Sequence, residues 1–327
     1  MKKIVFPMLI LLMAVGLFPE DTILLKKSES SDLLEKMEAN DFFMKGILGV
    51  DVDENCIYFL DQALGTVFRV DKNTAKLVNT IGSKGQGPAE LQYGDSFRVI
   101  NKMVFVADTG FNGIKIFTID GKIVKEFKTI SQPKWIDVNQ RNEIFVSGVS
   151  SEGYPNIAVY NMEGKKIREF LKFPYKDTGG ASYILNSELI FRMDKDENMG
   201  VVFLLKKLVR KYNKVGTVLW EKEIKNKIMD KYNTEPRFDI RSTGAIYYHR
   251  SVISLGFDET GNIIIGHVYG GVIYDKNGNM IHLVQFEPPS NLGNFRIYDG
   301  KILAIVNLGS DINVYQYNIN RRSNDEK

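Results

Sequence analysis

The chain has 327 residues, of which 44% are hydrophobic, 25% charged and 11% aromatic. This composition provides ample apolar side chains for a core, which excludes the disordered and fibrous classes of protein. The formal net charge is only +3, from 43 basic and 40 acidic side chains, so we expect no nucleic-acid partner. Cys56 is the single cysteine, so the chain forms no internal disulfide.

The first residues have the pattern of an export signal. Lys2 and Lys3 precede the apolar run Ile4–Phe18. A basic start followed by an apolar stretch of this length is typical of a secretory signal peptide and is short for a membrane span. We therefore expect residues 1–18 to be a signal peptide and the protein to be secreted or periplasmic, in a bacterial envelope. An uncleaved signal segment is the alternative, and it would be the only contact with a membrane.

The rest of the chain repeats one pattern, which runs strand, Asp/Asn/Gly turn, strand, loop, strand, Gly or Asn turn, strand. Copies of the pattern begin at Ile47, Ser96, Lys134, Ile190, Ile253 and Asn294. A repeat of roughly 40 to 60 residues with four antiparallel strands is typical of a β-propeller, because only a ring of blades buries both faces of every sheet. The sequence predicts an all-β fold, a six-bladed β-propeller with four antiparallel strands per blade. We expect one such domain over residues 19–320 and a disordered tail at 321–327.

The sixth copy has only three strands and needs a partner for its outer edge. The short apolar segment Thr22–Lys26 follows the signal segment and belongs to none of the copies. We predict that it pairs with Ile312–Ile319 and closes the ring as an N-terminal strand. A disordered N-terminus is the alternative.

Several segments resemble the NHL repeat, in which a Gly/Asn turn, a strand ending in Ala-Asp, a Gly/Asn loop and a strand ending in Asp-x-x-Gly follow one another. The resemblance is carried by "VFVADTGFNGIKIFTIDGK" at Val104–Lys122, "NEIFVSG" at Asn142–Gly148 and "NIIIGHV" at Asn262–Val268. The segment "IGSKGQGPAELQ" at Ile81–Gln92 is similar to a loop between the first two blades of related bacterial propellers. The resemblance extends from Ile47 to the end and implies the fold. It implies function poorly, because NHL-like propellers serve as enzymes, as carbohydrate or protein binders and as assembly modules.

The innermost strands of a propeller line its central channel, and one position of each copy places a polar residue there. These positions are Asp51, Arg98, Asp137, Asp194, Gly256 and Arg296. Three carboxylates against two guanidinium groups favour a self-paired, water-filled lining, since an unpaired buried charge costs several kcal/mol. The alternative is a Ca²⁺ site formed by Asp51, Asp137 and Asp194, because Ca²⁺ prefers carboxylate oxygens. The neighbouring arginines argue against that site.

One step nearer the channel mouth, the same alignment places Trp135 and Arg192. An aromatic ring beside a guanidinium is a recognition pair for a sugar or an acidic peptide, and the alternative is that Trp135 belongs to the core. His267 ends the second strand of its copy at the same mouth. No second histidine lies at ligand spacing, so we expect neither a zinc site nor a histidine-based triad. Asp108 in the equivalent position fits a structural role, accepting backbone N–H bonds in a turn.

Two loops exceed what the repeat needs. The insertion Lys225–Arg250 is rich in tyrosine and arginine, the composition of binding hot spots, and its candidate ligand-binding residues are Tyr247, Tyr248 and His249. A solvated loop with a short helix is the alternative. The Gly-rich segment Gly82–Leu91 lacks the Gly-Lys-Ser/Thr ending of a phosphate-binding loop. We expect it to be a structured loop over the mouth, with Lys84 and Glu90 available for contacts.

These patterns favour an exported binding or scaffold protein that recognises a protein, peptide or carbohydrate on one propeller face. They favour a protein without enzymatic activity or cofactor, and they assign neither catalytic residues nor metal ligands. The alternative is a Ca²⁺-dependent hydrolase or lyase with its site at the channel mouth.

Overall fold

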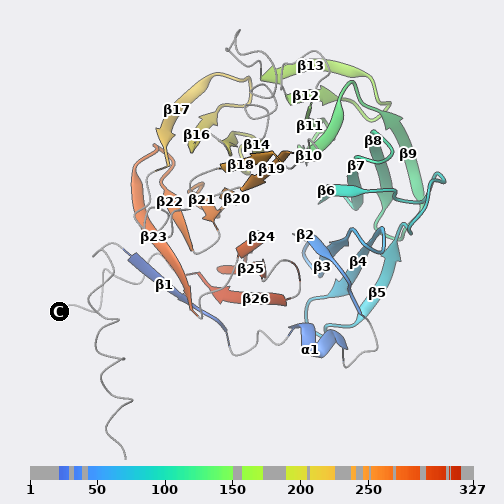
Figure 1. The fold of residues 1–327 in the computed structure, drawn as a ribbon, viewed down its shortest axis with the longest axis horizontal. Coiled ribbons are helices and arrows are strands. Elements are labelled where there is room, and N and C mark those ends of the chain that lie inside the picture. Colours follow the sequence, from blue (N-terminus) through green and yellow to red (C-terminus); the bar gives the residue numbers. More distant parts are fainter. Residues whose placement is uncertain are drawn as a thin grey trace, which may run out of the picture.

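The computed structural model describes residues 22–28, 33–38, 43–149, 157–171, 189–204, 207–224, 237–240, 246–249, 252–267, 270–287, 292–306, 309 and 311–317. In this part of the chain, six sheets stand side by side in a ring, which confirms the predicted all-β, six-bladed propeller (Figure 1). The predicted signal segment 1–18 and tail 321–327 lie outside the described residues. None of the helices among the described residues has the length and apolar character needed to span a membrane.

The blades follow one another in chain order, each starting with its innermost strand. Blade one comprises β2 (Ile47–Val52), β3 (Cys56–Asp61), β4 (Thr66–Asp71) and β5 (Leu77–Ile81). Blade two comprises β6 (Gly94–Ile100), β7 (Met103–Asp108), β8 (Gly113–Thr118) and β9 (Ile123–Lys128). Blade three comprises β10 (Gln132–Val138), β11 (Ile144–Val149), β12 (Ile157–Tyr160) and β13 (Lys166–Leu171).

The second half of the ring repeats this order. Blade four comprises β14 (Leu189–Met193), β15 (Met199–Phe203), β16 (Leu208–Tyr212) and β17 (Val218–Glu223). Blade five comprises β20 (Val252–Phe257), β21 (Ile263–His267), β22 (Gly270–Tyr274) and β23 (Met280–Glu287). Blade six comprises β24 (Leu292–Tyr298), β25 (Lys301–Val306) and β26 (Asp311–Gln316), so its described part has the three strands that the sixth copy predicts.

Turn chemistry repeats with the strands. In blade five, the Asp275 carboxylate accepts hydrogen bonds from the backbone N–H groups of Asn277 and Asn279, at 2.9 and 2.8 Å. Gly278 in the same turn has a φ of 84°, a left-handed conformation in which a side chain would be strained. The Asp and Gly residues that mark each hairpin in the sequence therefore have a local structural cause.

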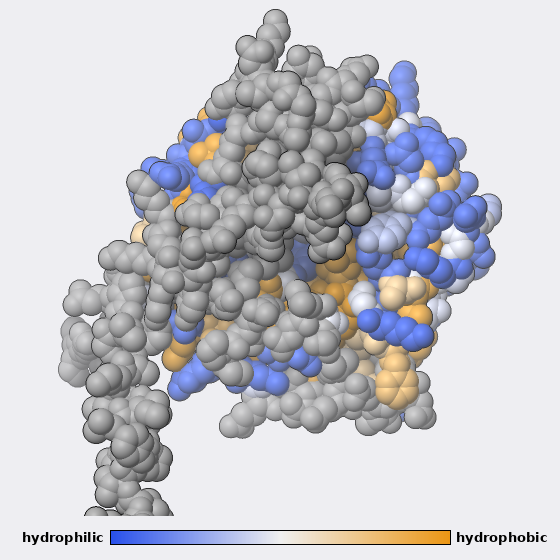
Figure 2. Space-filling model, in the orientation of Figure 1, coloured by the Kyte–Doolittle hydropathy of each residue, from blue (hydrophilic) through white to orange (hydrophobic). Residues whose placement is uncertain are grey.

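The hydrophobic core lies between neighbouring blades. Val50 and Phe59 of blade one pack in one cluster with Leu303 and Val314 of blade six, so the last blade packs directly on the first. The short helix α1 (Leu33–Glu38) adds buried side chains to this same cluster. The shared core between blades one and six closes the ring. In Figure 2, hydrophilic residues dominate the visible outer rim of the described part, and apolar residues lie nearer the centre.

The N-terminal strand β1 (Thr22–Lys26) does not pair where the sequence analysis placed it. It runs parallel to β23, with Thr22 opposite Leu283 and Lys26 opposite Glu287, and so becomes a fifth strand of blade five. The predicted pairing with Ile312–Ile319 is therefore wrong as the main pairing. The backbone bonds to blade six come from the residues after β1, through a Lys27–Tyr315 bridge and a Ser28 N–H bond to the Val314 carbonyl at 2.8 Å, while Leu25 of β1 packs in a cluster with Tyr315 of that blade. Closure of the ring by this strand is not confirmed.

Candidate functional site

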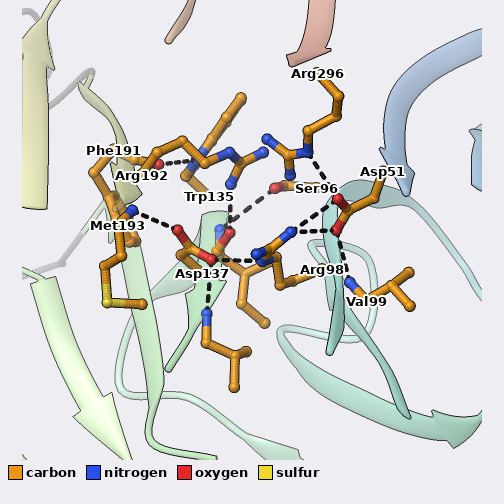
Figure 3. Close-up of polar contacts among 12 residues, drawn as sticks. Asp51, Ser96, Arg98, Val99, Trp135, Asp137, Phe191, Arg192, Met193 and Arg296 are labelled. Atoms are coloured by element: carbon orange, nitrogen blue, oxygen red, sulfur yellow. Dashed lines mark hydrogen bonds and ion pairs between the residues drawn. The ribbon is translucent and has the colours of Figure 1, made fainter. Parts of the chain in front are cut away.

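Five charged side chains from five different blades converge in the central channel (Figure 3). They are Asp51 on β2, Arg98 on β6, Asp137 on β10, Arg192 on β14 and Arg296 on β24. The five residues occupy equivalent positions near the ends of their innermost strands, which we call the channel positions. Their partners on the adjacent second strands are Tyr58, Phe105, Phe145, Gly200 and Leu303. Gly256 occupies this position in blade five.

Arg98 joins the two carboxylates of the channel. Its Nη1 lies 2.8 and 2.9 Å from the two oxygens of Asp51, and its Nε lies 3.0 Å from Oδ1 of Asp137. Both carboxylates are buried, whereas the Arg98 side chain is 26% exposed. Part of the Arg98 side chain is therefore open to solvent, although its Nε is shielded.

Asp51 is held as a carboxylate by its neighbours. Arg296 Nε donates to Oδ1 at 2.8 Å, and the Val99 backbone N–H donates to Oδ2 at 2.7 Å. Burial alone would raise the pKa of Asp51, but Arg296, Arg98 and the Val99 N–H together hold it well below its ordinary value. Asp51 is therefore charged at neutral pH, and its oxygens are occupied.

Asp137 repeats this arrangement two blades further on. Its Oδ2 accepts a hydrogen bond from the Met193 backbone N–H at 2.8 Å, as Asp51 accepts from Val99. In both cases the carboxylate accepts the backbone N–H of the residue directly after the channel arginine of the next blade. Val99 follows Arg98, and Met193 follows Arg192. The two aspartates therefore tie blade one to blade two and blade three to blade four, which is a structural role.

Arg192 has no carboxylate within ion-pair distance among the described residues. Its Nη1 donates to the Ile136 carbonyl at 2.9 Å, and its guanidinium lies 4.5 Å from the centre of the Trp135 ring. Its buried Nε has no hydrogen-bond partner among the described residues, and neither has Nη2 of Arg296. Burial, followed by the positive charge of Arg296, lowers the pKa of Arg192 below its ordinary value. The environment of Arg192 therefore disfavours its charge.

Asp194 does not lie in the channel, and its assignment to the channel lining was wrong. It begins the turn after β14, where its Oδ1 accepts the N–H groups of Asp196 and Asn198 at 2.9 and 2.8 Å. Its Oδ2 lies 3.3 Å from Lys211 Nζ. Arg192, which the alignment placed one step nearer the mouth, takes the channel position of blade four instead.

A signal for the correct register exists in the sequence. Asp258 in blade five begins an equivalent turn and accepts the N–H of Asn262 at 2.9 Å, as Asp194 does from Asn198. Aligning the two Asp-x-x-x-Asn turns places Arg192 level with Gly256. The described residues of the channel then include three arginines and two aspartates, a net charge of one positive unit rather than the expected negative one.

This composition does not fit a Ca²⁺ ion. A hard cation needs several free carboxylate or carbonyl oxygens. Here the two carboxylates are each bound to Arg98 and to backbone N–H groups, and the third expected carboxylate, Asp194, lies elsewhere. A dication would also add charge to a cluster that is already positive.

Trp135 lies beside Arg192, as the alignment indicated, and spans two blades. Its Nε1 donates to the Phe191 carbonyl at 2.7 Å, and its ring is partly buried against core residues of blades three and four. With the edge nitrogen bonded and one face on the guanidinium, what remains exposed of the ring is apolar surface. A role of this pair in recognition stays a prediction.

His267 lies at the end of β21 and is only 1% exposed. Its burial lowers the pKa of the imidazole to about 4, so the side chain is neutral at physiological pH. It does not present an imidazole to solvent at the mouth, and its expected part in ligand binding stays a prediction.

The Gly-rich loop is structured, but Lys84 and Glu90 are bonded within it rather than left free for a partner. Lys84 Nζ donates to the Gln92 carbonyl at 2.7 Å, and the Glu90 carboxylate accepts the Gly87 N–H at 2.7 Å. The residue that sequence reasoning missed is Lys115. It is fully buried and donates to the carbonyls of Gly87 and Glu90, at 2.6 Å each.

The described residues of the insertion between blades four and five form a two-stranded sheet. Strand β18 (Arg237–Ile240) pairs antiparallel with β19 (Ile246–His249). Tyr247, Tyr248 and His249 belong to β19, and their part in binding stays a prediction. Residues 225–236, 241–245 and 250 of the insertion lie outside the described residues.

Neither protein-family models nor curated proteins match this sequence. Solved structures do match its fold. Virginiamycin B lyase from Staphylococcus aureus is 13% identical, with a TM-score of 0.54 over 84% of this chain and 95% of the lyase. A Bacteroides fragilis protein described as exported is also 13% identical, with a TM-score of 0.54 over 89% and 93% of the two chains. Kuenenia stuttgartiensis hydrazine synthase is 12% identical, with a TM-score of 0.54 over 84% and 96%.

These similarities show the fold alone, because the identities are low and the named proteins differ in activity. Together with the ring of six blades they define the chain as a six-bladed β-propeller with a charged central channel. Membership of the NHL-repeat group is not confirmed.

Proposed function

We propose that this protein is an exported β-propeller of NHL-like type that binds a protein, peptide or carbohydrate partner around its central channel. The observation that carries the proposal is the pairing of Trp135 with Arg192. A partly exposed aromatic ring over a buried guanidinium provides apolar contact area and directed hydrogen-bond donors in one place. Binding proteins use this combination at the centre of their interfaces.

Export is supported by two independent observations. The basic and apolar pattern of residues 1–18 is typical of a secretory signal. A Bacteroides fragilis protein described as exported shares the fold over 89% of this chain. The location would be the periplasm or the outside of a bacterial cell.

The channel supports binding better than catalysis. Its two carboxylates are fixed by arginine and backbone N–H groups, an arrangement that favours a structural role over that of a general base. The resemblance to a lyase is one of fold and carries no residue role to this chain. We therefore make no proposal of a Ca²⁺-dependent hydrolase or lyase.

The test compares the two tryptophans of the chain. Peptide and oligosaccharide panels are screened for binding to the protein without residues 1–18, and the dissociation constants of hits are measured for Trp135→Ala and Trp220→Ala. Trp220 is the matched control because it lies on the outer strand β17, where its Nε1 donates to the Lys276 carbonyl at 2.9 Å. We expect Trp135→Ala to weaken binding about ten-fold or more and Trp220→Ala to leave it unchanged. Ligands that depend on Trp220 and not on Trp135 would contradict the proposed location.

A further inference from the structure

We infer that the central channel binds a carboxylate group of the ligand between the guanidinium groups of Arg192 and Arg296. The inference rests on the proposed function in taking the channel as the ligand site, and it adds the chemistry of the group that enters. Three observations carry it: unpaired donors, an unbalanced charge and a fixed orientation of one guanidinium.

The unpaired donors belong to side chains that are almost completely buried. Arg192 is 4% exposed and Arg296 is 7% exposed. Arg192 Nε and Arg296 Nη2 are both shielded from solvent, and neither has a hydrogen-bond partner among the described residues. In Figure 3 the two guanidinium groups point toward each other across the channel. Buried polar groups in native proteins are nearly always bonded, so unpartnered donors on two facing guanidinium groups indicate a missing acceptor.

The charge of the cluster indicates the same group. In the part of the chain that the structure describes, three guanidinium and two carboxylate groups leave one positive unit, and burial of an uncompensated charge is strongly unfavourable. A carboxylate carries one negative unit and neutralises the cluster. A phosphate monoester carries nearly two and would leave an excess of negative charge. The unbalanced arginine is Arg192, because Arg98 is already paired with Asp51 and Asp137, and Arg296 with Asp51.

The Trp135 ring fixes the direction of the Arg192 donors. The guanidinium lies 4.5 Å from the ring centre, while its Nη1 is bound to the Ile136 carbonyl. A planar guanidinium held on two sides loses little freedom when an acceptor arrives, and its geometry matches the two oxygens of a carboxylate. The apolar part of the Trp135 ring next to it provides a surface for the carbon skeleton of the ligand.

The test uses acetate as the minimal probe, with the protein lacking residues 1–18, in a buffer free of chloride and of other carboxylates. Acetate, acetamide, chloride and phosphate are added separately at equal ionic strength, and the melting temperature is measured. We expect a saturable rise with acetate, no rise with acetamide and a smaller response to chloride and phosphate. Glucuronate and an N-acetylated dipeptide with a free C-terminus then show which kind of ligand supplies the carboxylate.

Variants locate the effect. Arg192→Met should abolish the acetate response, whereas Arg141→Met should retain it, because Arg141 is 57% exposed on the surface. Arg192→Lys keeps the charge but not the planar fork and should weaken acetate binding about ten-fold. If Arg192→Met does not fold, the acetate response of Arg192→Lys tests the inference instead.

Four results would overturn the inference. An equal response to chloride would show a halide site, and a stronger response to phosphate would show a different anion class. An acetate response that is unchanged in Arg192→Lys and in any folded Arg192→Met protein would place the carboxylate elsewhere. If acetate has no effect but macromolecular binding still depends on Trp135, this inference fails while the proposed function stands.

Discussion

Arg98 and Asp51 join blades one and two in the channel, with Nη1 of the arginine 2.8 and 2.9 Å from the two carboxylate oxygens. The same guanidinium lies 3.0 Å from Asp137 of blade three, so one side chain connects three blades. Because both carboxylates are buried, they depend on Arg98 for their charge compensation.

Replacing Arg98 by methionine should therefore be strongly destabilising. The change leaves Asp137 without an ion-pair partner among the described residues and Asp51 with Arg296 alone, and breaking a buried pair in this way costs about 3–5 kcal/mol. The free energy of unfolding, measured by denaturant titration, should fall by that amount. Arg141→Met, a change on the exposed surface, is the control and should stay within about 0.5 kcal/mol of the parent protein.

His267 should make stability fall between neutral and acidic pH. Its pKa is about 4 when folded and 6.5 when unfolded, so between these values only the unfolded chain binds the proton. The free energy of unfolding therefore decreases as pH falls from about 6.5 to about 4, by at most about 3 kcal/mol. Denaturant titrations at several pH values should show this slope, and His267→Gln should flatten it. A slope that the variant retains would mean that other groups cause it.

Asp51 should act in a separate and lower window. Its folded pKa lies below the ordinary value of 3.8, so its contribution to stability is complete above that value. As pH falls below 3.8, the unfolded chain takes up the proton first and the contribution is lost. Acid unfolding followed by tryptophan fluorescence should show this second decline in His267→Gln as well. Its absence would contradict the strong pairing of Asp51 with the channel arginines.

Leu25 should stabilise the seam between blades five and six, although β1 pairs mainly with blade five. Its side chain is 3% exposed and packs in one cluster with Phe286 and Tyr315. Leu25→Ala should cost about 2–5 kcal/mol of unfolding free energy. Leu24→Ala is the matched control, because that neighbour is 44% exposed, and it should cost less than about 0.5 kcal/mol. Equal costs would show that β1 does not dock as described.

Lys115 should hold the Gly-rich loop in place. Its buried Nζ donates to the carbonyls of Gly87 and Glu90, and Lys115→Met would leave both acceptors unsatisfied. Hydrogen–deuterium exchange should then become faster in residues 82–92 and change little in the other blades. Lys125→Met, on the exposed outer strand β9, should leave the exchange of this loop as it is. Equal acceleration of all blades would indicate global destabilisation instead.

Much of the fold could be predicted because each hairpin carries its own local signal. Asp108 illustrates this, since its carboxylate accepts the N–H groups of Gln92 and Tyr93 at 2.8 Å each and that of Phe111 at 3.1 Å. Such turns depend on residues close to the hairpin, so the repeated Asp and Gly positions indicate where strands end. Interactions between distant parts of the chain leave a weaker signal.

Two errors of prediction follow from this difference. The sequence alignment of blade four was shifted by two residues, so that it placed Asp194 where the structure has Arg192. A shift of two residues leaves each side chain on the same face of the strand, so the apolar pattern did not reveal the error. The short strand β1 has no turn that ties it to a neighbour, and its apolar residues suit the edge of blade five as well as that of blade six. The unpaired donors of the channel depend on side chains from several blades and became visible only in three dimensions.

The central claim is that the channel carries one positive charge too many, on Arg192. The most direct measurement is the free energy of unfolding of Arg192→Met in the buffer without chloride or carboxylate, beside Arg98→Met. Removing an uncompensated buried charge should leave stability unchanged or raise it, despite the lost bond to Ile136 and the lost contact with Trp135. A loss for Arg192→Met as large as that for Arg98→Met would contradict the account, because Arg192 would then be a paired structural residue.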